Sequence, residues 1–99
     1  MITEIAMLTI DPARAAEFET AVAIAAPLFR AAKGCHGMAL ERVIEHPGQY
    51  RLVVGWENVE AHMRDFRESA AFGQWRALAG PFFIGPADVT HSESVAAYF

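Results

Sequence analysis

Apolar and polar residues follow a strand-like pattern in four segments of the chain. Residues 2–10, 37–45 and 50–57 are rich in β-branched and aliphatic side chains, and residues 87–98 carry a last alternating pattern. Segments of this composition, bounded by Gly, Pro, Asn and Asp, are typical of strands. The turn residues 46–49 separate the second segment from the third and predict a hairpin.

Helical patterns fill the gap after the first strand and the gap before the last. Asp11 and Pro12 predict a helix start, because Asp caps N-termini and Pro suits the first turn. Pro27 is expected to kink this helix or end it early, and Gly34 predicts the final stop. The apolar stripe of this helix consists of Phe18, Val22, Ala25 and Phe29.

The second helical region is expected to be split in two. Asn58 can cap a helix that runs to about residue 67, and Ser69 can cap another that runs to about residue 78. Large flat side chains recur here about one helical turn apart, which places them on one stripe. They are His62, Phe66, Phe72 and Trp75.

This element order, β-α-β-β-α-β, predicts an α+β fold of the ferredoxin-like type. We expect an antiparallel sheet, helices on one of its faces and a single domain over residues 1–99. The strands carry apolar residues on both faces, and one helical layer covers only one of them. The other face is therefore predicted to pack against a second copy, which gives a homodimer and a dimeric α+β barrel. The alternative is that Ile5, Met7 and Val53 are scattered exposed apolar residues.

Composition and charge narrow the range of partners. The 99 residues are 54% hydrophobic and 20% charged, with a formal net charge of −4 and scattered Lys and Arg. Nucleic acid and anionic membranes are not expected partners, because both need a basic patch. The N-terminus lacks the pattern of a signal peptide, and Cys35 has no internal disulfide partner. We therefore expect a soluble cytoplasmic protein.

One sequence frame is more specific than the rest. Trp56, Glu57 and Asn58 close the third strand, and Ser69, Ala70, Ala71 and Phe72 follow in the split helix. In this frame, in element order and in length, nearly the whole chain resembles the antibiotic biosynthesis monooxygenase family of dimeric α+β barrels. Known members of that family include cofactor-independent oxygenases of polycyclic quinols, haem-degrading oxygenases and enzymes that act on a signalling sugar derivative. The resemblance implies the fold more firmly than the activity.

The residues that carry particular chemistries in that family match unevenly. Many quinol-type members have a His three residues before the Ser of the frame, where this chain has Phe66. Haem-degrading members have Trp at that place and a further His and Asn, to which Arg76 and Met7 correspond here. The resemblance therefore implies no haem. We expect no cofactor and no metal, since the chain also lacks metal-ligand spacings and a dinucleotide fingerprint.

Two histidines are the candidate catalytic residues. His62 lies one turn before Phe66 on the same helix face, where it can act as a general base or donate a hydrogen bond to a phenol. The alternative for His62 is a partly exposed ring that bonds to Glu57 or Glu60. His91 lies on the last strand; it enters the pocket if its face meets the helices, and the dimer interface if it does not. His62 is our first candidate and His91 the second.

The aromatic residues near His62 suggest a substrate pocket between the sheet and the helices. Flat apolar walls suit a flat apolar substrate, and an arginine can hold an oxyanion. Each ring taken alone is better explained as part of the core, and only the rings taken together suggest a pocket. The predicted substrate-binding residues are Trp56, Phe66, Phe72, Trp75, Arg76 and Phe83.

These features together favour a cofactor-independent monooxygenase that binds a small or polycyclic phenol or quinol. The protein would stabilise the phenolate, which can pass an electron to oxygen without a metal. One alternative is a non-enzymatic small-molecule-binding or stress-associated dimeric barrel, which Phe66 in place of the family His favours. Another alternative is a non-oxidative isomerase that acts on a similar ligand.

Overall fold

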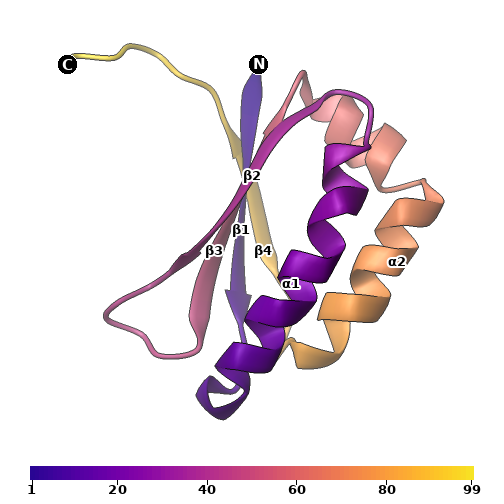
Figure 1. Cartoon of the computed structure of the whole chain (residues 1–99). Coiled ribbons are helices and arrows are strands. Elements are labelled where there is room, and N and C mark those ends of the chain that lie inside the picture. Colours follow the sequence, from indigo (N-terminus) through magenta and orange to yellow (C-terminus); the bar gives the residue numbers. More distant parts are fainter.

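The computed structural model describes residues 1–99 as a four-stranded antiparallel sheet with helices on one face (Figure 1). The strands lie in the order β2-β3-β1-β4, and each neighbouring pair is antiparallel. This arrangement confirms the predicted α+β ferredoxin-like fold. The strands are β1 (Ile2–Thr9), β2 (Cys35–Arg42), β3 (Gln49–Trp56) and β4 (Asp88–Ser92).

The first helix begins as the sequence predicts. Asp11 Oδ1 accepts a hydrogen bond from the Ala13 amide at 2.9 Å, and the short 3-10 turn η1 (Pro12–Arg14) leads into α1 (Ala15–Arg30). The predicted stripe of α1 is buried, because Phe18, Val22, Ala25 and Phe29 face the sheet. The helix continues three residues beyond Pro27. Gly34 then adopts φ +82°, a left-handed conformation that turns the chain into β2.

The second helical region is split, as predicted, into η2 (Ala61–Phe66) and α2 (Ala70–Ala79), followed by the short turn η3 (Gly80–Phe82). Asn58 Oδ1 accepts from the Ala61 amide at 2.8 Å, and Ser69 Oγ accepts from the Phe72 amide at 3.4 Å. One feature differs from the expected α-helix, since η2 has π-helical geometry. The Arg67 amide donates to the His62 carbonyl at 3.1 Å, five residues back. Such wide turns are frequent at functional sites.

The hydrophobic core lies between the sheet and the helical layer. The inner face of β3 is fully covered, and β1 contributes alternate residues on the same face. Aromatic rings from α1 and η2 fill the space above them. The largest buried side chains are Tyr50, Leu52, Val54 and Trp56 from β3 and Phe18 and Phe29 from α1.

The opposite face of the sheet has no helical layer (Figure 1). Ile5, Met7 and Val53 point to this face and remain partly exposed. The homodimer that would cover them stays a prediction. No helix of the structure is both long enough and apolar enough to cross a bilayer.

The last strand is shorter than the sequence pattern indicates. The predicted strand reached residue 98, whereas β4 ends at Ser92 and the following residues are exposed. The physical reason is the register with β1. Ser92 pairs with Thr3, one residue from the start of β1, so little of β1 remains for later residues to pair with. The terminal segment leaves the body of the protein beside the N-terminus (Figure 1).

Candidate functional site

Two buried polar side chains lie together inside the apolar core, and they belong to Glu4 and His62, which are 5% and 4% exposed. Trp56 Nε1 donates to Glu4 Oε1 at 2.9 Å, and His62 Nε2 lies 3.3 Å from the same oxygen. On its other side, His62 Nδ1 lies 2.9 Å from His91 Nε2. These contacts connect a buried carboxylate, through a buried imidazole, to a histidine on the edge strand β4. We call these three residues the Glu4–His62–His91 chain.

The sheet register places the two ends of this chain. Glu4 lies on the inner face of β1 with Ala6 and Leu8, and His91 of β4 is its direct partner in the ladder. Residues that pair directly in an antiparallel ladder point to the same face. His91 therefore faces the helical layer, which decides between the two positions that the sequence left open.

His62 reaches Glu4 and His91 from the helical side. Its imidazole stacks on the Trp56 indole, with ring centroids 5.3 Å apart and an interplanar angle of 19°. The π-helical turn of η2 begins one residue before it. His62 is thus held by a ring on one face and by a polar partner at each nitrogen.

The carboxylate partner of His62 is Glu4, and neither Glu57 nor Glu60 takes this role. Sequence reasoning overlooked Glu4, although a usable signal was present. Glu4 alternates with Ile2 and Ala6, so it is a carboxylate in the middle of a strand face that is otherwise apolar. A buried carboxylate needs a polar partner, and such a position is a reason to search for one.

Burial changes the acid–base properties of both inner residues. The pKa of His62 falls to about 4, first because burial penalises the imidazolium, then because His91 and Arg67 are nearby. Burial raises the pKa of Glu4, while the Trp56 hydrogen bond and the Arg67 charge partly oppose this rise. His62 is therefore neutral at neutral pH, and its contact with Glu4 is not a pair of opposite charges.

His91 is the part of the chain that a ligand can reach. It is partly exposed, whereas His62 and Glu4 are buried. Its Nε2 is occupied by His62, which leaves Nδ1 as the ring nitrogen for an outside partner. The chain has the arrangement of an accessible base that is oriented by a second group, which is oriented in turn by a third.

The aromatic residues predicted to bind substrate mostly pack against one another. Trp56, Phe66 and Trp75 are buried, and Phe66 lies 4.8 Å from Phe29 and 5.2 Å from Trp56 between ring centroids. Phe72 and Phe83 are partly buried against the same core, and Arg76 is exposed in the last turn of α2. A substrate role for the six residues together stays a prediction.

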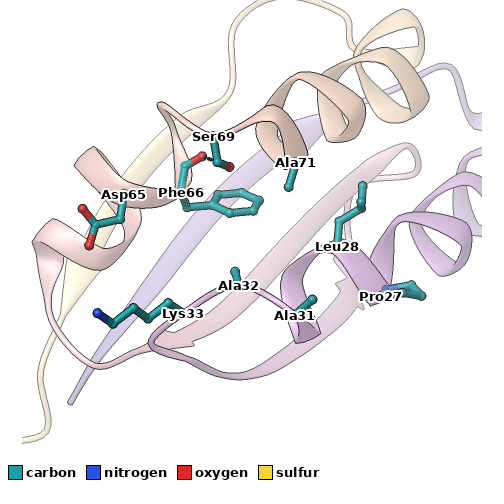
Figure 2. Close-up of a pocket in the computed structure, with 9 residues that line it drawn as sticks. All are labelled: Pro27, Leu28, Ala31, Ala32, Lys33, Asp65, Phe66, Ser69 and Ala71. Atoms are coloured by element: carbon teal, nitrogen blue, oxygen red, sulfur yellow. Dashed lines mark hydrogen bonds between the residues drawn. The ribbon is translucent and has the colours of Figure 1, made fainter.

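Two surface grooves lie beside this core. The first, of about 430 Å³, runs between the end of α1 and the junction of η2 with α2. Figure 2 shows the Phe66 side chain extending into it, with Lys33 and Asp65 toward one end. Of the predicted substrate residues only Phe66 lines this groove. The second groove, of about 530 Å³, lies between α1 and β2 and is lined by other residues.

The structure contains no group of three or more His, Cys, Asp or Glu side chains arranged as a metal site. In the Glu4–His62–His91 chain each contact joins one pair of atoms, His91 Nε2 with His62 Nδ1 and His62 Nε2 with Glu4 Oε1. This arrangement suits the transfer of protons.

The structure is that of a small α+β protein of the ferredoxin-like class in which two buried polar side chains connect to a partly exposed histidine on an edge strand. A family model described as antibiotic biosynthesis monooxygenase matches residues 1–78. The chain belongs to the antibiotic biosynthesis monooxygenase family.

Individual relatives agree with this assignment. The YczJ protein of Bacillus subtilis is 36% identical over 95 residues, which cover 96% of this chain and 100% of YczJ. A candidate antibiotic biosynthesis monooxygenase from Bordetella bronchiseptica has a structure 53% identical in sequence, with a TM-score of 0.94 over 96% of this chain and 97% of its own. SnoaB, a cofactor-independent oxygenase from Streptomyces nogalater, is 18% identical and shares the fold, with a TM-score of 0.81 over 98% and 95%.

Proposed function

We propose that this protein is a cofactor-independent oxygenase that acts on a small or polycyclic phenol or quinol. The observation that carries the proposal is the Glu4–His62–His91 chain, which presents a partly exposed imidazole backed by two buried groups. We further propose that it works as a cytoplasmic homodimer. The homodimer would cover the apolar outer face of the sheet, and a lone Cys35 suits a reducing compartment.

The central requirement of the proposed reaction is a base that removes the proton of the phenol. A phenol ionises near pH 10, and its anion is the form that readily gives an electron to oxygen. A positioned base contributes about 10²–10⁴-fold by removing the proton during the reaction. His91 Nδ1 is the better candidate for the contact with substrate, because His62 is buried and has a neighbour at each ring nitrogen.

The comparisons support this proposal at the level of fold and family. SnoaB, which has the same fold, is named as a cofactor-independent oxygenase. Shared fold does not transfer a substrate, so the support for a phenol or quinol comes from the acid–base site and from the family.

Oxygen uptake with a panel of soluble quinols tests the proposal. We expect the wild type to consume oxygen and His91→Gln to be slower by about 10²–10⁴-fold, with little change in affinity. His36→Gln is the matched control, because His36 is an exposed histidine that does not belong to the Glu4–His62–His91 chain.

Each failure of this experiment points to one alternative. If the wild type binds quinols but consumes no oxygen, the protein is a binding barrel. If it converts them without oxygen, it is an isomerase. If His91→Gln retains full activity, His91 is not the base.

A further inference from the structure

We propose that the Glu4–His62–His91 chain is a proton relay, in which Glu4 is the final acceptor of a proton that enters at His91 Nδ1. The proposal rests on the proposed function only for the source of the proton, a phenol or quinol hydroxyl. Its geometry is independent of that source. Two contacts form the relay, 2.9 Å between His62 Nδ1 and His91 Nε2 and 3.3 Å between His62 Nε2 and Glu4 Oε1.

An ionised Glu4 sets the tautomers of both histidines. Its Oε1 accepts from Trp56 Nε1, and the facing His62 Nε2 must carry a hydrogen to approach the same carboxylate favourably. A neutral His62 then has a lone pair on Nδ1, so His91 Nε2 must donate to it. His91 Nδ1 is left with a lone pair at the outer end of the chain, where it can accept a proton.

A protonated Glu4 reverses every donor and acceptor. The ligand O–H bond breaks as the His91 Nδ1–H bond forms, and His91 passes its Nε2 proton to His62 Nδ1. His62 in turn passes its Nε2 proton to the Glu4 carboxylate. The sum is one proton moved from the ligand to Glu4 and one negative charge moved from Glu4 to the ligand oxygen. No electron is transferred in this step.

The core favours this movement of charge. An ionised carboxylate inside an apolar core is costly, and protonation removes that cost. Burial accordingly raises the pKa of Glu4, against the opposing effects of Trp56 from β3 and Arg67 at the end of η2. Because the pKa of His62 is lowered to about 4, the proton passes through His62 and does not remain on it.

The contact between His62 and Glu4 is slightly long for a well-formed N–H···O hydrogen bond. Acid–base contacts are often long in ligand-free proteins and shorten in the complex. The Trp56 indole stacks on the imidazole of His62 and restricts the orientation of its ring.

The tautomers themselves provide a test that needs no substrate. Imidazole ¹⁵N chemical shifts distinguish a protonated from an unprotonated ring nitrogen, and can be followed against pH in the whole protein. We expect His62 and His91 to change from Nε2–H to Nδ1–H together, with one shared midpoint. In Glu4→Gln, which cannot take up the proton, this shared transition should be absent.

A second variant leaves Glu4 in place and breaks the relay in the middle. In His62→Gln, His91 should show no change of tautomer at the midpoint seen in the wild type. This result keeps the proposal testable even if Glu4→Gln does not fold. The proposal is overturned if the two histidines change tautomer at separate midpoints in the wild type, or if His91 keeps the shared transition in either variant.

Oxygen uptake then separates the relay from the proposed function. If the wild type is an oxygenase, Glu4→Gln should lower kcat about as much as His91→Gln does and remove the same limb of the pH profile. If no quinol is oxidised but the shared tautomer change is present, the proposed function fails and the relay stands. If Glu4→Gln oxidises quinols at the wild-type rate, the relay fails.

Discussion

The burial of each polar side chain in the site depends on contacts with its neighbours. The residues concerned are Glu4, Trp56, His62 and His91. Glu4 tolerates burial because Trp56 donates to it, and His62 tolerates burial because polar groups meet both of its nitrogens. Removal of one partner leaves the next one without a hydrogen bond in an apolar core, which costs about 1–3 kcal/mol. The chain therefore affects stability as well as acid–base behaviour.

The burial of neutral His62 predicts a stability that falls in acid. In the folded protein its pKa is about 4 instead of 6.5, so the unfolded state binds more protons between these two values. The stabilising contribution is full above pH 6.5 and is lost as the pH falls toward 4, by up to about 3 kcal/mol. His91, Arg67 and Glu4 are the charged or titratable groups that face His62.

Denaturant unfolding of the wild type and of His62→Gln at several pH values measures this contribution. Glu4 acts in the opposite direction, since its raised pKa makes protonation favour the folded state as the pH falls. His62→Gln removes the titrating imidazole and keeps the Glu4 carboxyl, so the wild type should lose more stability than the variant as the pH falls from 6.5 toward 4. Identical pH dependence in the two proteins would contradict the prediction.

The helical layer depends on contacts between its elements. Ser69 Oγ donates to the Phe66 carbonyl at 2.6 Å and accepts from the Phe72 amide, so one side chain joins the end of η2 to the start of α2. Trp75 then anchors α2 on α1, edge to face with Phe29 at 5.1 Å between ring centroids. The split of the second helix thus lets two short helices cover the sheet at different positions.

Trp75→Ala should destabilise the protein by about 3–5 kcal/mol, the usual cost of deleting a buried aromatic ring. Trp75 is 7% exposed and also contacts Phe83. The free energy of unfolding in denaturant measures the loss, and Gln74→Ala on the exposed side of the same helix is the control. A loss below about 1 kcal/mol for Trp75→Ala would mean that this ring is not a core anchor.

In a single copy of the protein, apolar residues remain exposed in two places, the outer face of the sheet and the terminal segment after β4. Ile5, Met7 and Val53 lie together on that face, and Val95, Tyr98 and Phe99 are exposed beyond β4. Contiguous apolar surface of this kind commonly marks an interface. A second copy packed face to face would cover the sheet.

Val53→Glu should convert a homodimer into a monomer, because it places a charge in the middle of the proposed interface. Sedimentation or light scattering at micromolar concentration measures the mass. Ile24→Glu is the matched control, since Ile24 is 59% exposed on α1, away from that face, and should leave the mass unchanged. A wild-type protein that is already a monomer would refute the predicted dimer.

Local chemistry made much of this fold predictable from the sequence. Capping by Asp11, Asn58 and Ser69, the left-handed turn at Gly34 and the alternation of apolar residues depend on neighbours a few positions away. Such short-range effects act before any tertiary contact exists, which is why the element order and the helix starts were correct.

The site was predictable only in its parts. His62 and His91 stood out as histidines on the right elements, but the sequence could not decide which of them met the other or what lay behind them. Their contact joins residues far apart in the chain, and it depends on the ladder register that sets His91 opposite Glu4. The strand β4 was overextended for the same reason, because its length depends on where β1 begins.

The sequence by itself determined the order of elements, their caps and the faces that must be buried. Tertiary structure decided that Glu4, His62 and His91 form one line, that η2 is a π-helix and that most of the aromatic rings are core. The physical reason is the range of the interactions. Caps and periodicity are local, whereas the burial of a polar group is acceptable only when distant elements bring its partners within hydrogen-bonding distance.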